Sequence, residues 1–287
     1  MPDPTLAELI GFDGVLEVAD VGAAWLGEPP AYKPLVDAGL ARLHAFEADA
    51  RQHVRLREVY GEAIALYAQV LGDGTAQTLN IATPGSGMTS LLKPSAAHLA
   101  FFNGFDVFGR LVETQAVATT RLDDVAGLPD LDFLKMDIQG AELTVLHHGT
   151  LRLSRAVMVQ LEVSFVPLYE DQPTFGEVDV FMRAAGFLPH SFAELKRWSI
   201  APVLRNNDVR QPFNQLLEAD IVYARDPMAA ERMDDGQIRA MILIAHHAYH
   251  SVDLAGRMVL RLESTGAAPA GTFDRYIAFL NTPQGRA

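Results

Sequence analysis

Short apolar runs recur along the chain, and most of them end in an acidic residue or a glycine before a helical pattern begins. They are rich in Val, Ile, Leu and Phe, and they read as continuous rather than alternating, which is typical of strands buried on both faces. Such strands alternating with helices indicate βαβ units and a parallel sheet, so we expect an α/β fold. The predicted strands are residues 14–24, 41–49, 62–74, 132–137, 156–165, 186–192 and 218–227, although the first half of the third run equally suits a helix.

Helical spacing of apolar residues predicts a helix over 174–186, which closes at Gly186, a residue that commonly ends helices. The C-terminal part is helical throughout, and its first helix has Asp234 or Asp235 as a candidate N-cap. We therefore predict an α/β domain followed by a C-terminal helical extension. The domain covers residues 1–226 and the extension 227–287, with helices at 234–251, 253–264 and 272–281.

The pattern is weaker between residues 74 and 122, and within this part the run "ATPGSGMTSLLKPS" (82–95) is loop-like, with Pro84, Gly85, Gly87 and Pro94. A loop of this length beside a sheet is either a lid or substrate loop or a surface excursion. Its part from Thr83 to Phe108 carries several large apolar side chains that suit either an acceptor wall or a core. They are Met88, Leu91, Phe101, Phe102 and Phe105.

Charge and composition limit the class of partner. The chain has 287 residues and a formal net charge of −13, which argues against duplex nucleic acid or an anionic membrane surface as a partner. Its lack of cysteine excludes disulfides, thiolate zinc sites and cysteine nucleophiles. The opening from Met1 to Pro4 has no signal-peptide character, and no apolar run is long enough to span a bilayer. We therefore expect a cytoplasmic protein without membrane insertion.

Acidic residues gather at the carboxyl ends of the predicted strands, the edge where open α/β sheets bind ligands. One acid at a strand end usually caps a helix or turn, but five on one edge favour a polar, hydroxyl-rich or cationic ligand. These five are Asp20, Glu47, Asp73, Asp137 and Glu162.

Glu47 is the clearest of these acids. It closes the second strand about 25 residues after Gly22, the place from which an acid accepts the hydroxyls of an adenosine ribose. Gly22 itself suits either close backbone approach to a ligand or a tight turn. Because the run "DVGAAWLGEPP" lacks the G-x-G-x-x-G phosphate cradle, the site suits a nucleoside cofactor without phosphates. S-adenosylmethionine, whose sulfonium tolerates an acidic cleft, is the cofactor that we predict.

Four segments in order, "DVGAA", "HAFEAD", "TTRLDDVAGLPDLDFLKMDIQGAELTVLHHG" and "VQLEVSF", resemble the FkbM family of S-adenosylmethionine-dependent methyltransferases over roughly residues 15–225. The resemblance implies the class I methyltransferase fold, a Rossmann-like, mostly parallel seven-stranded sheet with an antiparallel last strand. It also implies O-methylation of a hydroxyl on a sugar, glycan or polyketide-like small molecule. Combined with the strand-end acids, it predicts cofactor contacts at Asp20, Gly22, Ala23, Glu47, Asp73 and Asp137.

Methyl transfer to an alcohol benefits from a positioned base. We hypothesise that Asp137 faces the methionine end of the cofactor or the acceptor hydroxyl, with Glu142 and Glu162 as alternative bases. Glu142 equally suits the first turn of a helix, where a carboxylate is favourable. Lys135 is placed to pair with one of these acids. Gln139 stands where many family members have glutamate, so an essential acid at that position is not expected here.

Alternative functions remain open from the residues alone. His246 and His250 are four residues apart on a predicted helix, but no third ligand is evident, so no metal site is predicted. An NAD-dependent oxidoreductase would also use Glu47 but would need the missing phosphate loop. A non-catalytic Rossmann-like binding module serving the C-terminal helices is the other alternative. The sequence is compatible with a homo-oligomer.

Overall fold

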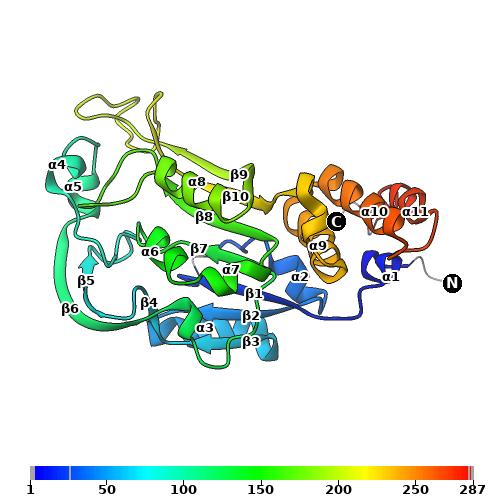
Figure 1. The fold of residues 1–287 in the computed structure, drawn as a ribbon. Helices are drawn as coiled ribbons and strands as arrows, with labels where there is room; N and C mark the ends of the chain where they lie inside the picture. The colour runs from blue at the N-terminus through cyan, green and yellow to red at the C-terminus, as the bar shows by residue number, and fades with distance from the viewer. Residues whose placement is uncertain (1–3, 26, 284, 286–287) are drawn as a thin grey trace.

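A seven-stranded sheet forms the centre of the molecule in the computed structural model, which describes residues 4–25, 27–283 and 285. Its order is β3-β2-β1-β7-β8-β10-β9 (Figure 1). All neighbouring pairs are parallel except those of β10, which runs antiparallel to both β8 and β9. This order confirms the predicted fold, with the antiparallel strand in the segment expected for it. The strands are β1 (Leu16–Val21), β2 (Ala41–Phe46), β3 (Ile64–Tyr67), β7 (Phe133–Met136), β8 (Met158–Ser164), β9 (Phe187–Arg197) and β10 (Leu216–Arg225).

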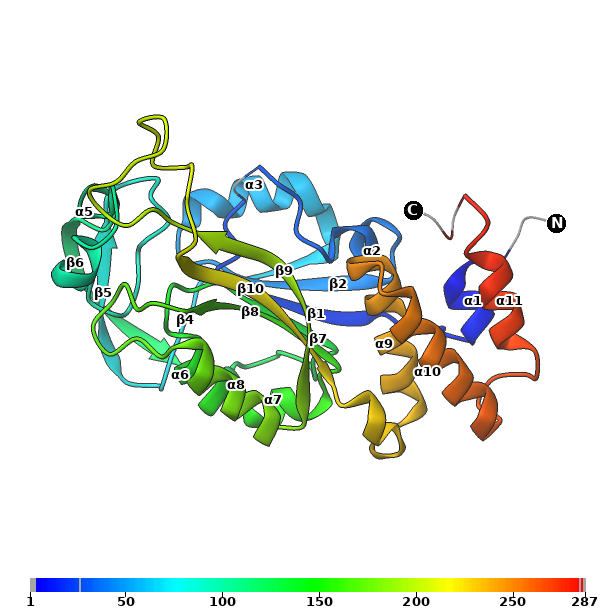
Figure 2. The ribbon, with the colours of Figure 1, turned by 90° about the horizontal axis from the view of Figure 1, so that it is seen from above.

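Helices cover both faces of this sheet (Figure 2). Alternate residues of a strand point to opposite faces, so Leu16 and Val18 of β1 join one apolar cluster, whereas Ala19 and Val21 join the other. The first cluster includes side chains of α1 (Leu6–Ile10), α2 (Lys33–Asp37) and α3 (Ala50–Tyr60). The second includes side chains of α6 (Glu142–His147), α7 (Thr150–Arg155) and α8 (Phe175–Ala184). Burial on both faces explains the continuous apolar runs in the sequence.

The segment between residues 62 and 122 differs from its prediction. The single strand expected over 62–74 is wrong, because a 3₁₀ turn (η1, Gly61–Ala63) leads into β3 and a break separates β3 from β4 (Val70–Leu71). The loop-like run over 82–95 is confirmed from residue 83 onward, but the weak pattern on either side of it contains two strands that were not predicted. These strands, β5 (Ala76–Ala82) and β6 (Leu111–Thr120), pair antiparallel and form a second sheet with β4. Most side chains of β6 are exposed, so its sequence shows no pattern of buried apolar residues from which a strand could be predicted.

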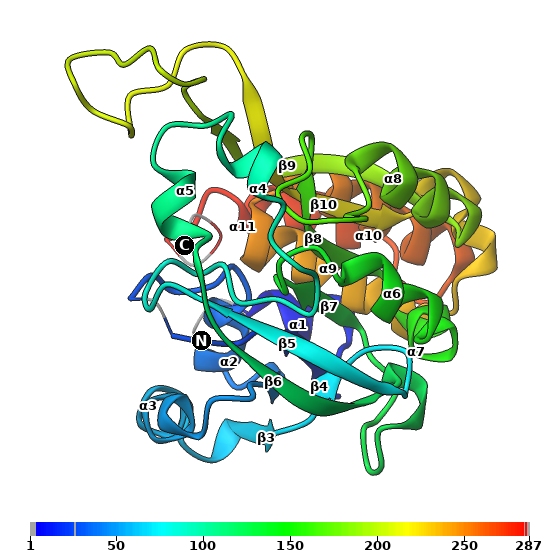
Figure 3. The same ribbon diagram turned by 90° about the vertical axis from the view of Figure 1, so that its left-hand side faces the viewer.

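The connection between β5 and β6 carries two short helices, α4 (Ala96–Leu99) and α5 (Phe105–Phe108). Met88, Phe102 and Phe105 are buried there in a third apolar cluster with Tyr169 and Leu217, which favours the core interpretation for these side chains. Phe101 is instead 47% exposed. Figure 3 shows this connection and the β5–β6 pair beside the edge at which the parallel strands end.

The predicted C-terminal helices are confirmed as α9 (Asp235–Tyr249), α10 (Val252–Thr265) and α11 (Thr272–Phe279), after a 3₁₀ segment (η3, Pro227–Arg232). Asp234 is the N-cap of α9 and forms a capping box with Gln237. α9 lies in the same apolar cluster as β1 and α2, at the end of the sheet opposite the β5–β6 pair (Figure 1). The division of the chain at residue 226 stays a prediction.

His246 of α9 belongs to the core, whereas His250, four residues on at the C-cap, is exposed. His246 is 1% exposed, and its Nδ1 lies 3.1 Å from the Tyr276 hydroxyl. Burial and the neighbouring His247 lower the pKa of His246 to about 4, so the ring is neutral at pH 7. Across residues 4–25, 27–283 and 285, no group of three or more His, Cys, Asp or Glu side chains is arranged so that it could hold a metal ion. Among these residues there is also no helix with the length and apolar character needed to cross a membrane.

Candidate functional site

The strand order reverses between β1 and β7, which start opposite halves of the sheet, and ligands of open α/β sheets bind at such a point. Gly22, directly after β1, has a φ of 83°, and a Cβ atom built on it would lie 2.1 Å from the carbonyl oxygen of Asp137. The backbone N–H groups of Gly22 and Ala23 both donate to the carbonyl oxygen of Phe46 at the end of β2. Only glycine permits this close approach, which brings three strand ends together.

Glu47 follows β2 at the same edge. Its Oε1 accepts a 2.7 Å hydrogen bond from the backbone N–H of Asp49, and its own N–H donates to the carbonyl oxygen of Tyr67, the last residue of β3. Burial raises the pKa of the Glu47 carboxyl despite the bond from Asp49. Among the described residues, Oε2 of Glu47 has no hydrogen-bond partner, so this oxygen is available to a ligand.

Asp137 and Glu162 converge on one side-chain amide. Nε2 of Gln139 donates to Oδ1 of Asp137 at 3.0 Å and to Oε2 of Glu162 at 2.7 Å, so each amide hydrogen holds one carboxylate. Oε1 of Gln139 accepts from the hydroxyl of Tyr169, which lies 3.1 Å away and equally close to the carbonyl oxygen of Met88. In the part of the chain that the structure describes, Oδ2 of Asp137 makes no hydrogen bond. We call Asp137, Gln139 and Glu162 the carboxylate clamp.

The backbone of the clamp is strained. Gln139 has a φ of 60° and Gly140 a φ of 100°, so two successive residues lie in the left-handed region, which is costly for the non-glycine residue. The hydroxyl of Ser90 donates to the carbonyl oxygen of Gln139 at 2.7 Å and supports this turn. Gly140 therefore forms part of a tight turn after Asp137.

Glu142 closes the same turn. Its Oε1 accepts a 2.8 Å hydrogen bond from the backbone N–H of Ile138, and the side chain is 3% exposed at the start of α6. Burial raises the pKa of Glu142 to about 7, although its bonds from backbone N–H groups oppose that rise. This geometry favours the helix-start interpretation, while a role as a base stays a prediction.

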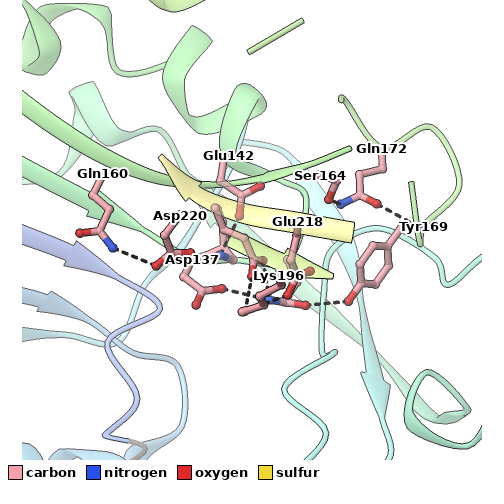
Figure 4. A network of polar contacts seen from close by, with 12 residues as sticks. Asp137, Glu142, Gln160, Ser164, Tyr169, Gln172, Lys196, Glu218 and Asp220 are labelled. Carbon is pink, nitrogen blue, oxygen red and sulfur yellow. Dashed lines mark hydrogen bonds and ion pairs between the residues drawn. The ribbon is translucent and has the colours of Figure 1, made fainter. Parts of the chain in front are cut away.

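Burial also governs Glu162, which lies within β8. Burial and the charges of Asp137 and Glu218 raise its pKa well above the usual value, and Lys196 opposes this with its Nζ 3.4 Å from Oε1. Lys196 is shared, because its Nζ also lies 2.8 Å from Oε1 of Glu218. Figure 4 shows Asp137, Lys196 and Glu218 drawn together, with the Tyr169 ring directed toward them.

Asp20 is the second-last residue of β1 and is 3% exposed. Its Oδ2 accepts a 2.6 Å hydrogen bond from the Tyr32 hydroxyl, and its Oδ1 lies 3.2 Å from Nζ of Lys135 on β7. Burial disfavours the charge of Lys135, but Asp20 and Asp137 outweigh it and raise the lysine pKa. Lys135 therefore pairs with an acid, but its partner is Asp20 rather than Asp137, Glu142 or Glu162, so the predicted partner is wrong. Since both oxygens of Asp20 already have partners, it is suited to supporting the site from beneath.

A second chain of polar contacts reaches the site from the C-terminal extension. The hydroxyl of Tyr249 on α9 donates to Oε1 of Gln160 at 2.8 Å, and Nε2 of Gln160 donates to Oδ2 of Asp220 at 2.9 Å. Asp220 pairs in register with Glu162, and burial together with Asp137 raises its pKa (Figure 4). The C-terminal helices therefore contribute one hydroxyl to the polar network.

Asp73 lies apart from these residues in the chain and in its contacts. It follows β4 of the second sheet, six positions beyond the last residue of β3, and its Oδ1 accepts from the backbone N–H and the hydroxyl of Thr75. These bonds hold its pKa at about 2. The expectation that it ends a strand of the main sheet is wrong, and its cofactor role stays a prediction.

The main omission of the sequence interpretation concerns Gln139. The sequence predicts no essential acid at this position, yet the side-chain amide of Gln139 joins Asp137 and Glu162. Lys196, Asp220 and Tyr169 were missed because their partners lie on other elements. A signal existed for Asp220 only, as an acid directly before the apolar run Ile221–Tyr223 of the predicted strand.

Residues 20–189 match the family model described as "Methyltransferase FkbM domain". This match covers more than half of the chain, so the protein belongs to the FkbM methyltransferase family, and S-adenosylmethionine is its cofactor. The resemblance and the cofactor predicted from the sequence are both confirmed.

A curated relative is the 2-O-methyltransferase NoeI of Sinorhizobium fredii, which is 29% identical over 143 residues. The aligned part covers 46% of this chain and 57% of that protein, so it spans little more than half of the relative's length.

Two solved structures are similar at low scores. Magnesium protoporphyrin IX methyltransferase from Synechocystis PCC 6803 has a TM-score of 0.37, with 14% identity over 77% of this chain and 76% of its own. The 23S rRNA methyltransferase ErmE has a TM-score of 0.36, with 13% identity over 94% and 96%. The fold assignment therefore rests on the strand order itself.

Replacing the clamp amide tests its contribution. Gln139→Met keeps the length of the side chain but removes both donors, so the facing carboxylates lose two charge-assisted bonds. We expect the free energy of unfolding at pH 7.5 to fall by about 2 kcal/mol. The gap to the unmutated protein should narrow as the pH falls, because the amide bond favours the ionised form of Glu162, and the raised pKa of this carboxyl makes it take up a proton above the usual range of a glutamate.

Urea unfolding at a series of pH values measures this gap, and Gln115→Met on the exposed face of β6 is the matched control. A gap below about 0.5 kcal/mol that does not change with pH would contradict a clamp that depends on ionised carboxylates.

Proposed function

We propose that this protein transfers the methyl group of S-adenosylmethionine to a hydroxyl of a sugar, glycan or polyketide-like small molecule. Family membership supports methyl transfer, and the name of the relative NoeI supports oxygen as the acceptor atom. The observation that carries the proposal is the carboxylate clamp at the carboxyl ends of β7 and β8. It leaves one oxygen of Asp137 without a partner among the described residues, beside the point where the strand order reverses.

The residues present fit this cofactor. Glu47 offers a carboxylate oxygen for the ribose hydroxyls, and the Gly22 turn permits close approach of a ligand to the backbone. The surrounding network contains six carboxyl groups and two ammonium groups, an acidic surplus that favours a cation. They are Asp20, Asp137, Glu142, Glu162, Glu218 and Asp220, against Lys135 and Lys196. When bound, S-adenosylmethionine supplies a methyl group on a positively charged sulfur.

Asp137 is the residue that we assign to the acceptor hydroxyl. Gln139 fixes Oδ1, so Oδ2 is oriented to accept the hydroxyl proton as the alcohol oxygen attacks. Glu162 shares the amide and is less suited, because both of its oxygens already face donors. Glu142 is also less suited, because its side chain is 3% exposed and its Oε1 closes the turn at Ile138.

Two other functions make different binding predictions. An NAD-dependent oxidoreductase would need a phosphate cradle after β1, where the turn has Gly22 and Ala23 bound to Phe46. A non-catalytic module would bind neither NAD nor the cofactor product. Thermal-shift measurements with S-adenosylhomocysteine and with NAD separate the three, and we expect stabilisation by the first ligand alone.

Glu47 should control cofactor affinity. Glu47→Gln replaces one acceptor oxygen by an amide donor and removes the charge, so we expect S-adenosylhomocysteine to bind about 10- to 100-fold more weakly. Calorimetry measures this change, and Glu231→Gln in η3, which is exposed, is the matched control. Equal affinity of Glu47→Gln and the unmutated protein would remove the ribose assignment.

Asp137 should control turnover rather than cofactor binding. Asp137→Asn keeps the shape but removes the base, so the rate of S-adenosylhomocysteine release with a hydroxylated acceptor should fall about 100-fold or more. Calorimetry with S-adenosylhomocysteine serves as the control for an intact site. Near-normal turnover of a variant that still binds would transfer the role to Glu162 or Glu142.

A further inference from the structure

One strand of the second sheet has a free edge. β6 pairs along most of its length with β5, whereas on its other side it pairs with β4 only at Thr119 and Thr120. Most of its side chains are exposed, among them Leu111 at 42% and Val112 at 57%. Figure 1 shows β6 at the margin of the molecule, at the end opposite the C-terminal helices. Among the described residues, no strand pairs with this side of β6 before Thr119.

Hydrogen bonding on β5 shows which backbone groups of β6 are free. The N–H and C=O groups of Asn80 both bond to Ser90, on the side of β5 that faces away from β6. Asn80 lies opposite Thr114, so this pair is not hydrogen-bonded, and bonded and non-bonded pairs alternate in an antiparallel ladder. Ala116 is therefore non-bonded as well, and the N–H and C=O groups of both residues point to the free edge. Within the part of the chain that the structure describes, these four backbone groups have no hydrogen-bond partner.

The other long exposed edge is protected against pairing, whereas this one is not. The outer strand of the main sheet is β9, which contains Pro189 and has three register shifts against β10, features that hinder strands from joining at an edge. From Thr114 to Ala118, β6 has neither proline nor charge, and its pairing with β5 is regular. Two copies of a chain of net charge −13 can therefore meet at this segment without placing like charges directly opposite each other.

We propose that β6 pairs antiparallel with β6 of a second copy of this chain, about a twofold axis at Gln115. Thr114 and Ala116 lie symmetrically on either side of Gln115, so this axis pairs Thr114 with the partner's Ala116 and satisfies all four free groups. Gln115 then faces the partner's Gln115 in a non-hydrogen-bonded pair, where opposite side chains are closest and two amides can bond to each other.

Neighbouring positions of the axis fit less well. An axis at Glu113 places two carboxylates directly opposite each other, which is destabilising. An axis at Thr114 pairs Ala116 with Val112 of the other copy, and Val112 lies at the register shift between β6 and β5. The axis at Gln115 instead sets Glu113 against the partner's Val117. None of these residues belongs to the carboxylate clamp, so the inference does not depend on the proposed function.

Charges introduced at Gln115 test this axis. Gln115→Glu and Gln115→Lys each place two like charges opposite each other in the pair, so we expect each variant alone to dimerise about fivefold more weakly or worse. An equimolar mixture of the two variants brings opposite charges together and should recover the dimer of the unmutated protein. Sedimentation velocity up to about 200 µM measures these dissociation constants, because a single strand pair forms a small interface.

Ser191→Glu and Ser191→Lys, on the exposed part of β9, are the matched controls and should dimerise as the unmutated protein does. The inference is overturned if the unmutated protein stays monomeric at about 200 µM. It is equally overturned if both Gln115 variants keep the dimer, if the Ser191 variants lose it, or if the mixture dimerises no better than its components. Recovery in the mixture excludes misfolding as the cause of the weaker dimers.

Discussion

The side-chain amide of Gln139 holds two carboxylates that would otherwise repel each other. Asp137 and Glu162 come together because β7 and β8 are neighbours in the sheet, and each receives one amide hydrogen. The amide is fixed in turn by the Tyr169 hydroxyl and by the left-handed turn that Ser90 and Glu142 support. This one group therefore determines which oxygen of Asp137 faces outward.

Charge balance around the clamp sets the character of the site. Lys135 and Lys196 neutralise part of the acidic surplus from within the sheet, through Asp20 on one side and Glu218 on the other. Burial raises the pKa of Glu162, so a cation placed against the clamp would favour its ionised form. An edge of this kind suits a sulfonium.

The sequence predicted the parts of the fold that depend on burial. Strands β1, β2, β7, β8 and β10 are buried on both faces, and their apolar runs could be read directly. β6 could not, because most of its side chains are exposed and its structure comes from backbone pairing with β5. Glu47, Asp137 and Glu162 could be predicted as site candidates because a carboxylate at the end of a buried strand is costly unless it has a partner.

Contacts between distant segments explain what the sequence did not reveal of the site. The sequence does not reveal the role of Gln139, because that role consists of hydrogen bonds to Asp137 and to Glu162, and Glu162 lies 23 positions away. Tyr249 joins Gln160 across 89 positions, and nothing local marks either residue as part of the network.

A crystal structure of the complex with S-adenosylhomocysteine tests the central claim most directly. The account predicts the ribose hydroxyls within about 2.6–3.2 Å of Glu47 and the sulfur facing the outward oxygen of Asp137, with the Gln139 amide still bridging Asp137 and Glu162. A ribose bound away from Glu47, or a sulfur remote from the clamp, would contradict it.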